Sequence, residues 1–120
     1  MAHVLVIDDD PLFREIATEM LVLDGHSVAQ AENGQAARRV MDRPDLAVVD
    51  MLMPERDGVE TIGDLTRRWP GVKLIAVSSG GRGLDPDLLL RTARAMGADA
   101  TMAKPLQADA FRELVRAMLA

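Results

Sequence analysis

The chain has 120 residues, a formal net charge of −5 and no cysteine. This length suits one domain with a single hydrophobic core, and the missing cysteines exclude disulfides, thiolate catalysis and cysteine-ligated zinc. The negative charge argues against direct binding of nucleic acid, because such proteins usually carry a basic face, and no apolar run approaches the roughly 18 residues that a membrane span needs. Since the start also lacks a signal-peptide pattern, we expect one acidic cytoplasmic domain over residues 1–120, without direct contact to nucleic acid or membrane.

Five short apolar runs along the chain predict β-strands. The central run, residues 46–49, is unbroken and rich in Val, which is typical of a strand that is buried on both faces. The run at residues 26–31 alternates weakly and carries Ser27 and Gln30, so it suits the edge of a sheet. The expected strands are residues 3–7, 26–31, 46–49, 72–77 and 99–103.

Helical spacing of apolar residues separates these strands. Asp10-Pro11 and Asp85-Pro86 each place a capping Asp before a Pro that fits the first turn of a helix. Helices are expected to start at residues 11, 34, 59 and 86 and close to residue 111, with their apolar positions facing the core. The methionines that we expect to fill gaps in the core are Met20, Met41, Met96 and Met118.

Strand and helix alternate five times along the chain. This order predicts an α/β fold, a doubly wound parallel sheet of five strands with right-handed crossovers and five helices on its two faces. Such sheets place their chemistry at the carboxyl ends of the strands. Polar residues stand there after every expected strand but the second, and they are Asp8, Asp9, Asp50, Ser78 and Lys104. If these four strands are neighbours, the polar groups converge on one crevice.

Each of these residues alone has an ordinary interpretation, as a helix cap, a turn residue or a surface lysine. Together they indicate a phosphoryl site. Three carboxylates at close range repel one another unless a cation neutralises them, and carboxylate oxygens are ligands for Mg²⁺. A hydroxyl and an ammonium group opposite the cluster would receive phosphoryl oxygens. In that setting Asp50 is a candidate nucleophile that forms an aspartyl-phosphate.

Four short motifs, in this order, resemble the receiver domain of two-component response regulators, and the resemblance covers the whole chain. The motifs are Ile7-Asp8-Asp9, then Asp50-Met51-Leu52-Met53-Pro54 with Asp57-Gly58, then Val77-Ser78-Ser79, then Lys104-Pro105. The resemblance implies a flavodoxin-like receiver fold with the strand order 2-1-3-4-5. It also implies a stand-alone receiver, although a receiver cut from a longer protein remains an alternative.

The resemblance assigns a role to each candidate residue. Asp50 is expected to be the phosphoacceptor, and Ser78 and Lys104 are expected to bind the phosphoryl group. The expected Mg²⁺ ligands are Asp8, Asp9, Asp50 and the main-chain carbonyl of Leu52. The implied partners are a sensor histidine kinase or histidine phosphotransfer protein as donor and a downstream protein as target. The chain is therefore expected to be a switch rather than an enzyme with a substrate of its own.

Two residues depart from the family pattern. Thr101 stands where the family often has an aromatic switch residue, so Ser78 and Thr101 are the expected switch pair. Leu52 stands where many relatives carry a polar group that positions water, which predicts slow self-dephosphorylation and a shorter phosphoryl lifetime in Leu52→Asn. The glycine-rich loop around Arg82 matches no nucleotide-binding pattern and is expected to act as a hinge.

Two other functions compete with the switch. A non-phosphorylated interaction module could share this fold, and Thr101 favours it, but the five intact polar residues count against it. A Mg²⁺-dependent phosphohydrolase would need a second carboxylate two residues after its nucleophile, and Leu52 occupies that position.

Overall fold

The computed structural model describes residues 1–51, 58–78 and 85–120 of the chain. Its five strands form one parallel sheet in the order β2-β1-β3-β4-β5. The strands are β1 (His3–Ile7), β2 (Ser27–Ala31), β3 (Leu46–Asp50), β4 (Lys73–Ser78) and β5 (Ala100–Ala103). This confirms the predicted sheet and its strand order, with β2 at one edge.

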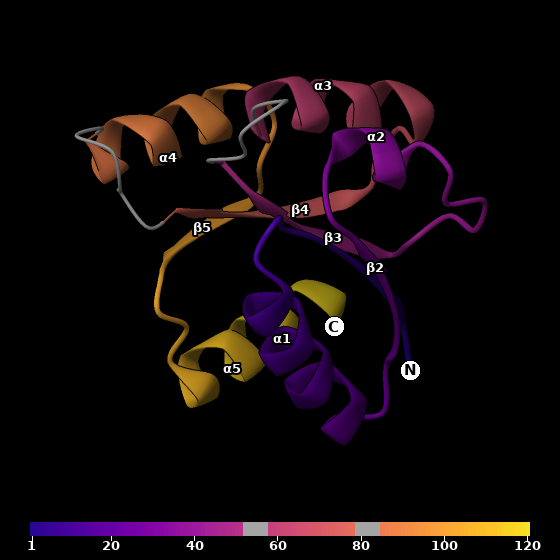
Figure 1. The fold of residues 1–120 in the computed structure, drawn as a ribbon. Coiled ribbons are helices and arrows are strands. Elements are labelled where there is room, and N and C mark those ends of the chain that lie inside the picture. Colours follow the sequence, from indigo (N-terminus) through magenta and orange to yellow (C-terminus); the bar gives the residue numbers. More distant parts are fainter. Residues whose placement is uncertain (52–57, 79–84) are drawn as a thin grey trace.

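Within the described ranges, five helices cover the two faces of the sheet. They are α1 (Pro11–Leu23), α2 (Gly34–Ala37), α3 (Gly58–Arg68), α4 (Pro86–Ala95) and α5 (Ala108–Leu119). Figure 1 shows α1 and α5 on one face and α2, α3 and α4 on the other. Among the described residues, no helix combines the length and the apolar composition that crossing a bilayer requires.

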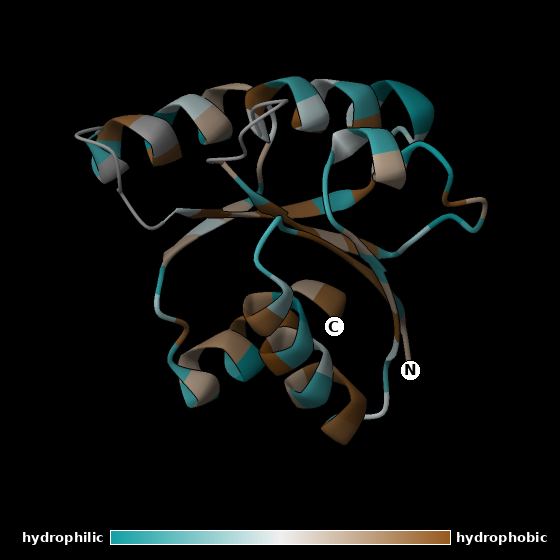
Figure 2. Ribbon diagram, in the orientation of Figure 1, coloured by the Kyte–Doolittle hydropathy of each residue, from teal (hydrophilic) through white to brown (hydrophobic). Residues whose placement is uncertain are grey.

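The hydrophobic core lies on both sides of the sheet. Every residue of β3 is buried, as its unbroken apolar sequence predicts. One cluster packs the sheet against α1 and α5 and includes Phe13, Leu21 and Phe111, while the other packs it against α2, α3 and α4. In Figure 2 the strands are mainly hydrophobic and the helices carry hydrophilic residues on their outer sides.

The ends of two helices follow the local sequence signals. Asp10 Oδ1 accepts a hydrogen bond from the N–H of Leu12 at 3.0 Å and caps α1, and Asp85 caps α4 in the same way. Gly25 and Gly97 follow the ends of these helices with φ values of 90° and 121°. Because L-residues rarely adopt such angles, glycine suits both C′ positions.

The second helix is shorter than the sequence predicts, and the inward position predicted for Met41 is wrong. α2 ends at Ala37, and the Met41 side chain is 82% exposed. The guanidinium of Arg68 donates to the main-chain carbonyls of Ala37, Arg38 and Val40, so a residue of α3 satisfies the carbonyls that follow this short helix. The apolar spacing after Ala37 therefore does not continue as a helix.

The methionines divide into two groups. Met20 and Met118 are partly buried and pack against the core, as predicted. Met96 is 44% exposed, so its predicted core position is wrong. It lies at the end of α4, beyond the part of that helix that packs on the sheet through Ala93.

Candidate functional site

Three carboxylates meet at the carboxyl ends of β1 and β3. Asp8 directly follows β1 and Asp50 ends β3, and the pairing of Ile7 with Val49 brings them to the same level of the sheet. Asp8 and Asp50 are buried and Asp9 is exposed. One oxygen from each carboxylate lies within 4.8 Å of the others. We call Asp8, Asp9 and Asp50 the acidic cluster.

The environment of Asp8 is unfavourable for a free charge. Its side chain is fully buried, and burial raises the pKa of the Asp8 carboxyl above its ordinary value. Contacts with Lys104 and with the N–H of Asp10 only partly offset this rise in pKa. The Asp10 N–H donates to Asp8 Oδ1 at 2.9 Å, and this bond ties the carboxylate to the turn before α1.

Lys104 brings a positive charge to the cluster from the end of β5. Its Nζ lies 2.8 Å from Asp8 Oδ2 and 3.7 Å from Asp50 Oδ2. The ammonium also lies 4.4 Å from the centre of the Phe13 ring, where a cation is attracted to the aromatic face. These contacts hold the lysine over the cluster, although its side chain keeps 17% exposure.

Ser78 ends β4, between the strands that carry Asp50 and Lys104. Its side chain is buried, and its carbonyl accepts a hydrogen bond from the N–H of Lys104 at 2.9 Å. On the other side of β3 the start of α3 lies very close to the strand, because a Cβ on Gly58 would lie 2.5 Å from the Asp50 carbonyl oxygen. Only glycine permits this approach of α3 to β3.

The donor set of the acidic cluster fits a hard divalent cation. Mg²⁺ prefers oxygen ligands, and the cluster offers one oxygen from each of three carboxylates. Asp8 Oδ2 is buried and, although it contacts the Lys104 ammonium, accepts no hydrogen bond of good geometry. Such an oxygen retains the capacity to bind a cation. The carbonyl of Leu52, which the resemblance to receiver domains adds to this set, lies outside the described residues.

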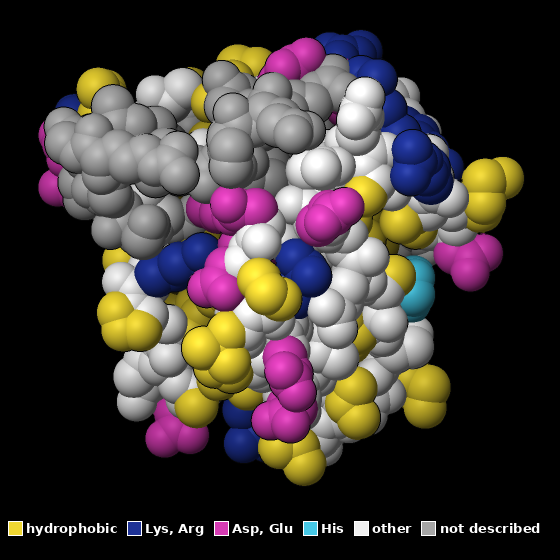
Figure 3. All heavy atoms as spheres, viewed as in Figure 1, with side chains coloured by type: hydrophobic (Ala, Val, Ile, Leu, Met, Phe, Trp, Pro, Cys, Tyr) yellow, Lys and Arg dark blue, Asp and Glu magenta, His cyan; other side chains and the backbone are white. Residues whose placement is uncertain are grey.

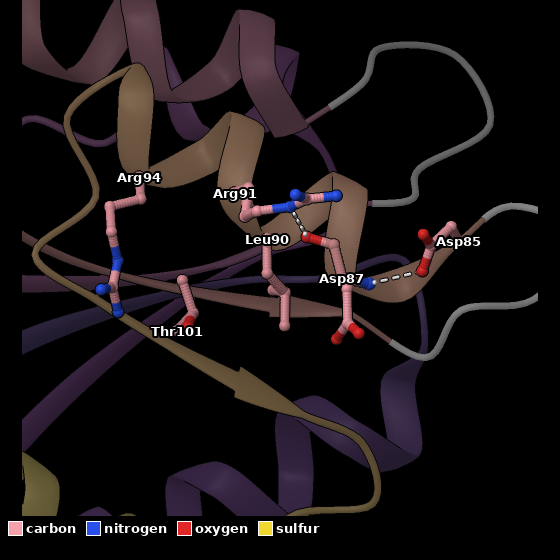
Figure 4. Close-up of a pocket in the computed structure, with 6 residues that line it drawn as sticks. All are labelled: Asp85, Asp87, Leu90, Arg91, Arg94 and Thr101. Carbon is pink, nitrogen blue, oxygen red and sulfur yellow. Dashed lines mark hydrogen bonds between the residues drawn. The ribbon is translucent and has the colours of Figure 1, made fainter.

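Thr101 lies away from the acidic cluster. It pairs with Ala76 in the sheet, two positions before the pairing of Ser78 with Ala103. Figure 4 shows Thr101 facing Leu90 and Arg94 of α4, on one side of an open cavity of about 500 Å³ that Asp87 also lines. The predicted switch pair is therefore split between the end of β4 and the surface between β5 and α4.

Sequence reasoning missed Arg14 and Phe13 as neighbours of the site. Arg14 Nη1 donates to the Asp8 carbonyl at 2.6 Å, and Phe13 lies beneath the Lys104 ammonium. Both belong to the first turns of α1, directly after the acidic turn. Phe13 and Arg14 stand four and five residues after Asp9 in the sequence. This close spacing to two adjacent carboxylates is the signal that could have indicated them.

An apolar groove adjoins the acidic cluster and shares Lys104 with it. The cavity measures about 350 Å³, and its apolar lining consists of Leu12, Phe13, Ile16, Pro105 and Leu106. Leu12 is 62% exposed and Ile16 is 40% exposed, although both belong to the apolar spacing of α1. In Figure 3 acidic and basic side chains lie together at the centre of the face, directly above hydrophobic side chains.

Comparison with known proteins identifies the family. The family model for the response regulator receiver domain matches residues 4–116. Chemotaxis protein CheY of Listeria monocytogenes is 34% identical over 114 residues, which are 91% of this chain and 92% of that protein. Chemotaxis protein CheY of Bacillus subtilis is 32% identical over 123 residues, with 99% of both chains covered.

Solved structures show the same fold. The CheY-like receiver domain protein from Methanospirillum hungatei superposes with a TM-score of 0.88 at 23% identity, covering 99% of this chain and 94% of that chain. Other relatives are much longer than the matched region. The transcriptional regulatory protein GlrR of Escherichia coli is 31% identical over 95% of this chain, which spans only 25% of GlrR. The chain belongs to the response regulator receiver domain family, whose general role is that of a phosphorylation switch in two-component signalling.

Proposed function

We propose that Asp50 accepts a phosphoryl group from a phosphohistidine of a sensor histidine kinase or a histidine phosphotransfer protein, and that the modified chain changes its contacts with a downstream protein. Mg²⁺ is the proposed cofactor. The observation that carries the proposal is the convergence of three carboxylates and one ammonium at the ends of β1, β3 and β5. A cytoplasmic location belongs to the proposal, and the cysteine-free sequence suits the reducing conditions there.

Asp50 is the proposed nucleophile because it ends the fully buried central strand. One carboxylate oxygen of Asp50 forms a bond to phosphorus, and the bond between phosphorus and the histidine nitrogen breaks. The electron pair of that bond stays on the imidazole of the donor. The product is an acyl phosphate, so the carboxylate charge of Asp50 is replaced by the charge of the phosphoryl group.

Asp8, Asp9 and Asp50 are the proposed protein ligands of Mg²⁺, together with the Leu52 carbonyl that the resemblance to receiver domains implies. When bound, the ion supplies positive charge that offsets the repulsion between the cluster and the incoming phosphoryl group. Asp8 and Asp50 contribute buried oxygens, and Asp9 contributes an exposed one. This division supports a site that opens to solvent on the Asp9 side.

Lys104 and Ser78 are the proposed receptors of the phosphoryl oxygens. The ammonium of Lys104 already lies within 3.7 Å of an Asp50 oxygen, so it is close to where the product charge would develop. A charged hydrogen-bond donor stabilises a negative charge more strongly in a partly buried site than in water. Ser78 ends β4, the strand next to β3, one residue after Val77, which pairs with Asp50.

The apolar groove is the proposed contact for the phosphodonor protein. A donor histidine must come within bonding distance of Asp50, so its protein must cover a surface beside the acidic cluster. The groove shares Lys104 with the cluster and exposes Leu12 and Ile16. Leu12→Ser is expected to slow transfer from a histidine-phosphotransfer protein, while transfer from acetyl phosphate, which needs no docking surface, stays unchanged.

Incubation with acetyl phosphate and Mg²⁺, followed by intact-mass measurement, tests the proposal. The wild type is expected to gain one phosphoryl group and Asp50→Asn none. Asp42→Asn, which removes an exposed carboxylate before the start of β3, at the end of the strand opposite to Asp50, is the matched control and should behave as the wild type. Absence of the modification in the wild type would favour a non-phosphorylated interaction module. Repeated turnover of a small phosphoester would favour a phosphohydrolase.

A further inference from the structure

We infer that Arg14 is a positioning residue for the acidic cluster. It holds the main chain between Asp8 and Asp9, and so fixes the direction in which Asp9 presents its carboxylate to a bound cation. This inference rests on the proposed function, because it concerns Mg²⁺ binding by the cluster.

The guanidinium of Arg14 joins two parts of the molecule. Its Nη1 donates to the Asp8 carbonyl at 2.6 Å, and its Nε donates to Gln30 Oε1 at 3.2 Å. Gln30 belongs to β2 and pairs with Val6 of β1, so it moves with the sheet. A planar guanidinium can make both contacts at once in a fixed geometry, which the single ammonium of a lysine cannot.

The other contacts of Asp8 show why the bond from Arg14 to the Asp8 carbonyl constrains the main chain. The Asp8 N–H donates to the Ala31 carbonyl at 3.1 Å, and Asp8 Oδ1 accepts from the Asp10 N–H at 2.9 Å. Arg14 holds the remaining main-chain group. Because the peptide unit is planar, fixing the Asp8 carbonyl also fixes the nitrogen of Asp9 and the direction of its Cα.

Asp9 depends on this main-chain constraint more than its neighbours do. Its carboxylate is exposed, and it makes no hydrogen bond or ion pair with any residue that the structure describes. Asp8, by contrast, is held by Asp10 and Lys104. Loss of the Arg14 contact would therefore release the one ligand of the cluster that no side chain orients.

A purely electrostatic role for Arg14 predicts the opposite effect on Mg²⁺ binding. A positive guanidinium beside the cluster repels a divalent cation, so its removal should tighten Mg²⁺ binding if charge alone matters. If Arg14 positions Asp9, its removal should weaken binding, because groups that orient metal ligands typically account for about 10–100-fold in affinity. The sign of the change therefore separates the two roles.

Isothermal titration of the full chain with Mg²⁺ measures this sign. Arg14→Gln and Arg14→Lys are both expected to weaken Mg²⁺ binding by about 10-fold or more, since neither side chain reproduces the bridge to Gln30. Arg43→Gln is the matched control, because Arg43 also donates to a main-chain carbonyl, that of Pro70 at 2.9 Å, but lies before β3 at the opposite end of the sheet. It should bind Mg²⁺ as the wild type does.

Gln30→Ala provides a second, independent variant. It leaves Arg14 and its charge in place but removes one anchor, so Mg²⁺ binding should weaken in the wild-type background and show no further loss in the Arg14→Gln background. Unchanged or tighter Mg²⁺ binding by Arg14→Gln, or by Gln30→Ala if the first variant does not fold, overturns the role of Arg14 and leaves the proposed function intact. Failure of the wild type to bind Mg²⁺ overturns both.

Discussion

Lys104→Met is expected to destabilise the metal-free protein at neutral pH. The substitution keeps a long side chain over Phe13 but removes the ammonium that contacts two buried carboxylates, Asp8 Oδ2 at 2.8 Å and Asp50 Oδ2 at 3.7 Å. Because Coulomb energy falls as the inverse of distance, the contact with Asp8 is stronger than that with Asp50 by about a third at equal dielectric constant. Removing one partner of a buried ion pair typically costs about 3–5 kcal/mol. Since Lys104 keeps 17% exposure, we expect a loss near the lower end, about 3 kcal/mol.

Urea unfolding followed by circular dichroism in EDTA measures this loss. Lys73→Met is the matched control, because Lys73 is an exposed lysine whose ammonium donates to the Met118 carbonyl, and its effect should stay within about 0.5 kcal/mol. Burial already raises the pKa of Asp8, and removal of Lys104 raises it further. An acid whose pKa is raised by folding loses stability as pH rises, so the deficit of Lys104→Met should shrink as pH falls from 7 toward 4. Equal stability of Lys104→Met and wild type at pH 7 would refute the reasoning.

Three further outcomes follow from single features of the structure. Mg²⁺ at about a hundred times its Kd should stabilise the wild type by about 2.7 kcal/mol, and Asp9→Ala should abolish this gain in a thermal melt. Gly58→Ala should lower the free energy of unfolding by about 1–3 kcal/mol in a urea titration, because the new Cβ would lie 2.5 Å from the Asp50 carbonyl oxygen. The contact with Arg112 lowers the pKa of Asp24, so the ion pair stabilises the protein at neutral pH and this contribution disappears as pH falls through the lowered pKa. Unfolding of Asp24→Asn and wild type should therefore differ at pH 7 and converge as the pH falls through the lowered pKa of Asp24, and a constant difference would contradict this interpretation.

The sequence predicted those features that depend on neighbouring residues. The unbroken apolar run of β3 required burial on both faces, and Asp10-Pro11 combined a cap with a first-turn proline. Alternation of strands and helices predicted a parallel sheet with its polar residues at one edge. The order of the strands did not follow from the alternation, because any right-handed crossover is compatible with several orders. It came from the resemblance to receiver domains.

The incorrect predictions involve contacts between distant segments. Met41 was expected in the core because the apolar spacing continues after Ala37, but Arg68 binds the carbonyls that end α2 and the chain leaves the helix. Arg14 was not recognised because its role depends on Gln30, which lies on a neighbouring strand. Neither contact leaves a periodic signal in the sequence.

The position of Lys104 links the acidic cluster to β5 and α5. In the unmodified protein its ammonium is nearer to Asp8 than to Asp50, since the two contacts measure 2.8 Å and 3.7 Å. A phosphoryl group on Asp50 would add negative charge near the carboxylate that is now more distant from Lys104. Electrostatic attraction would then favour a movement of the Lys104 ammonium toward Asp50. The main-chain N–H of Lys104 donates a hydrogen bond to the Ser78 carbonyl. A shift of the Lys104 main chain would therefore also displace the end of β4. A change of charge at Asp50 would then act on the ends of both β4 and β5 through Lys104.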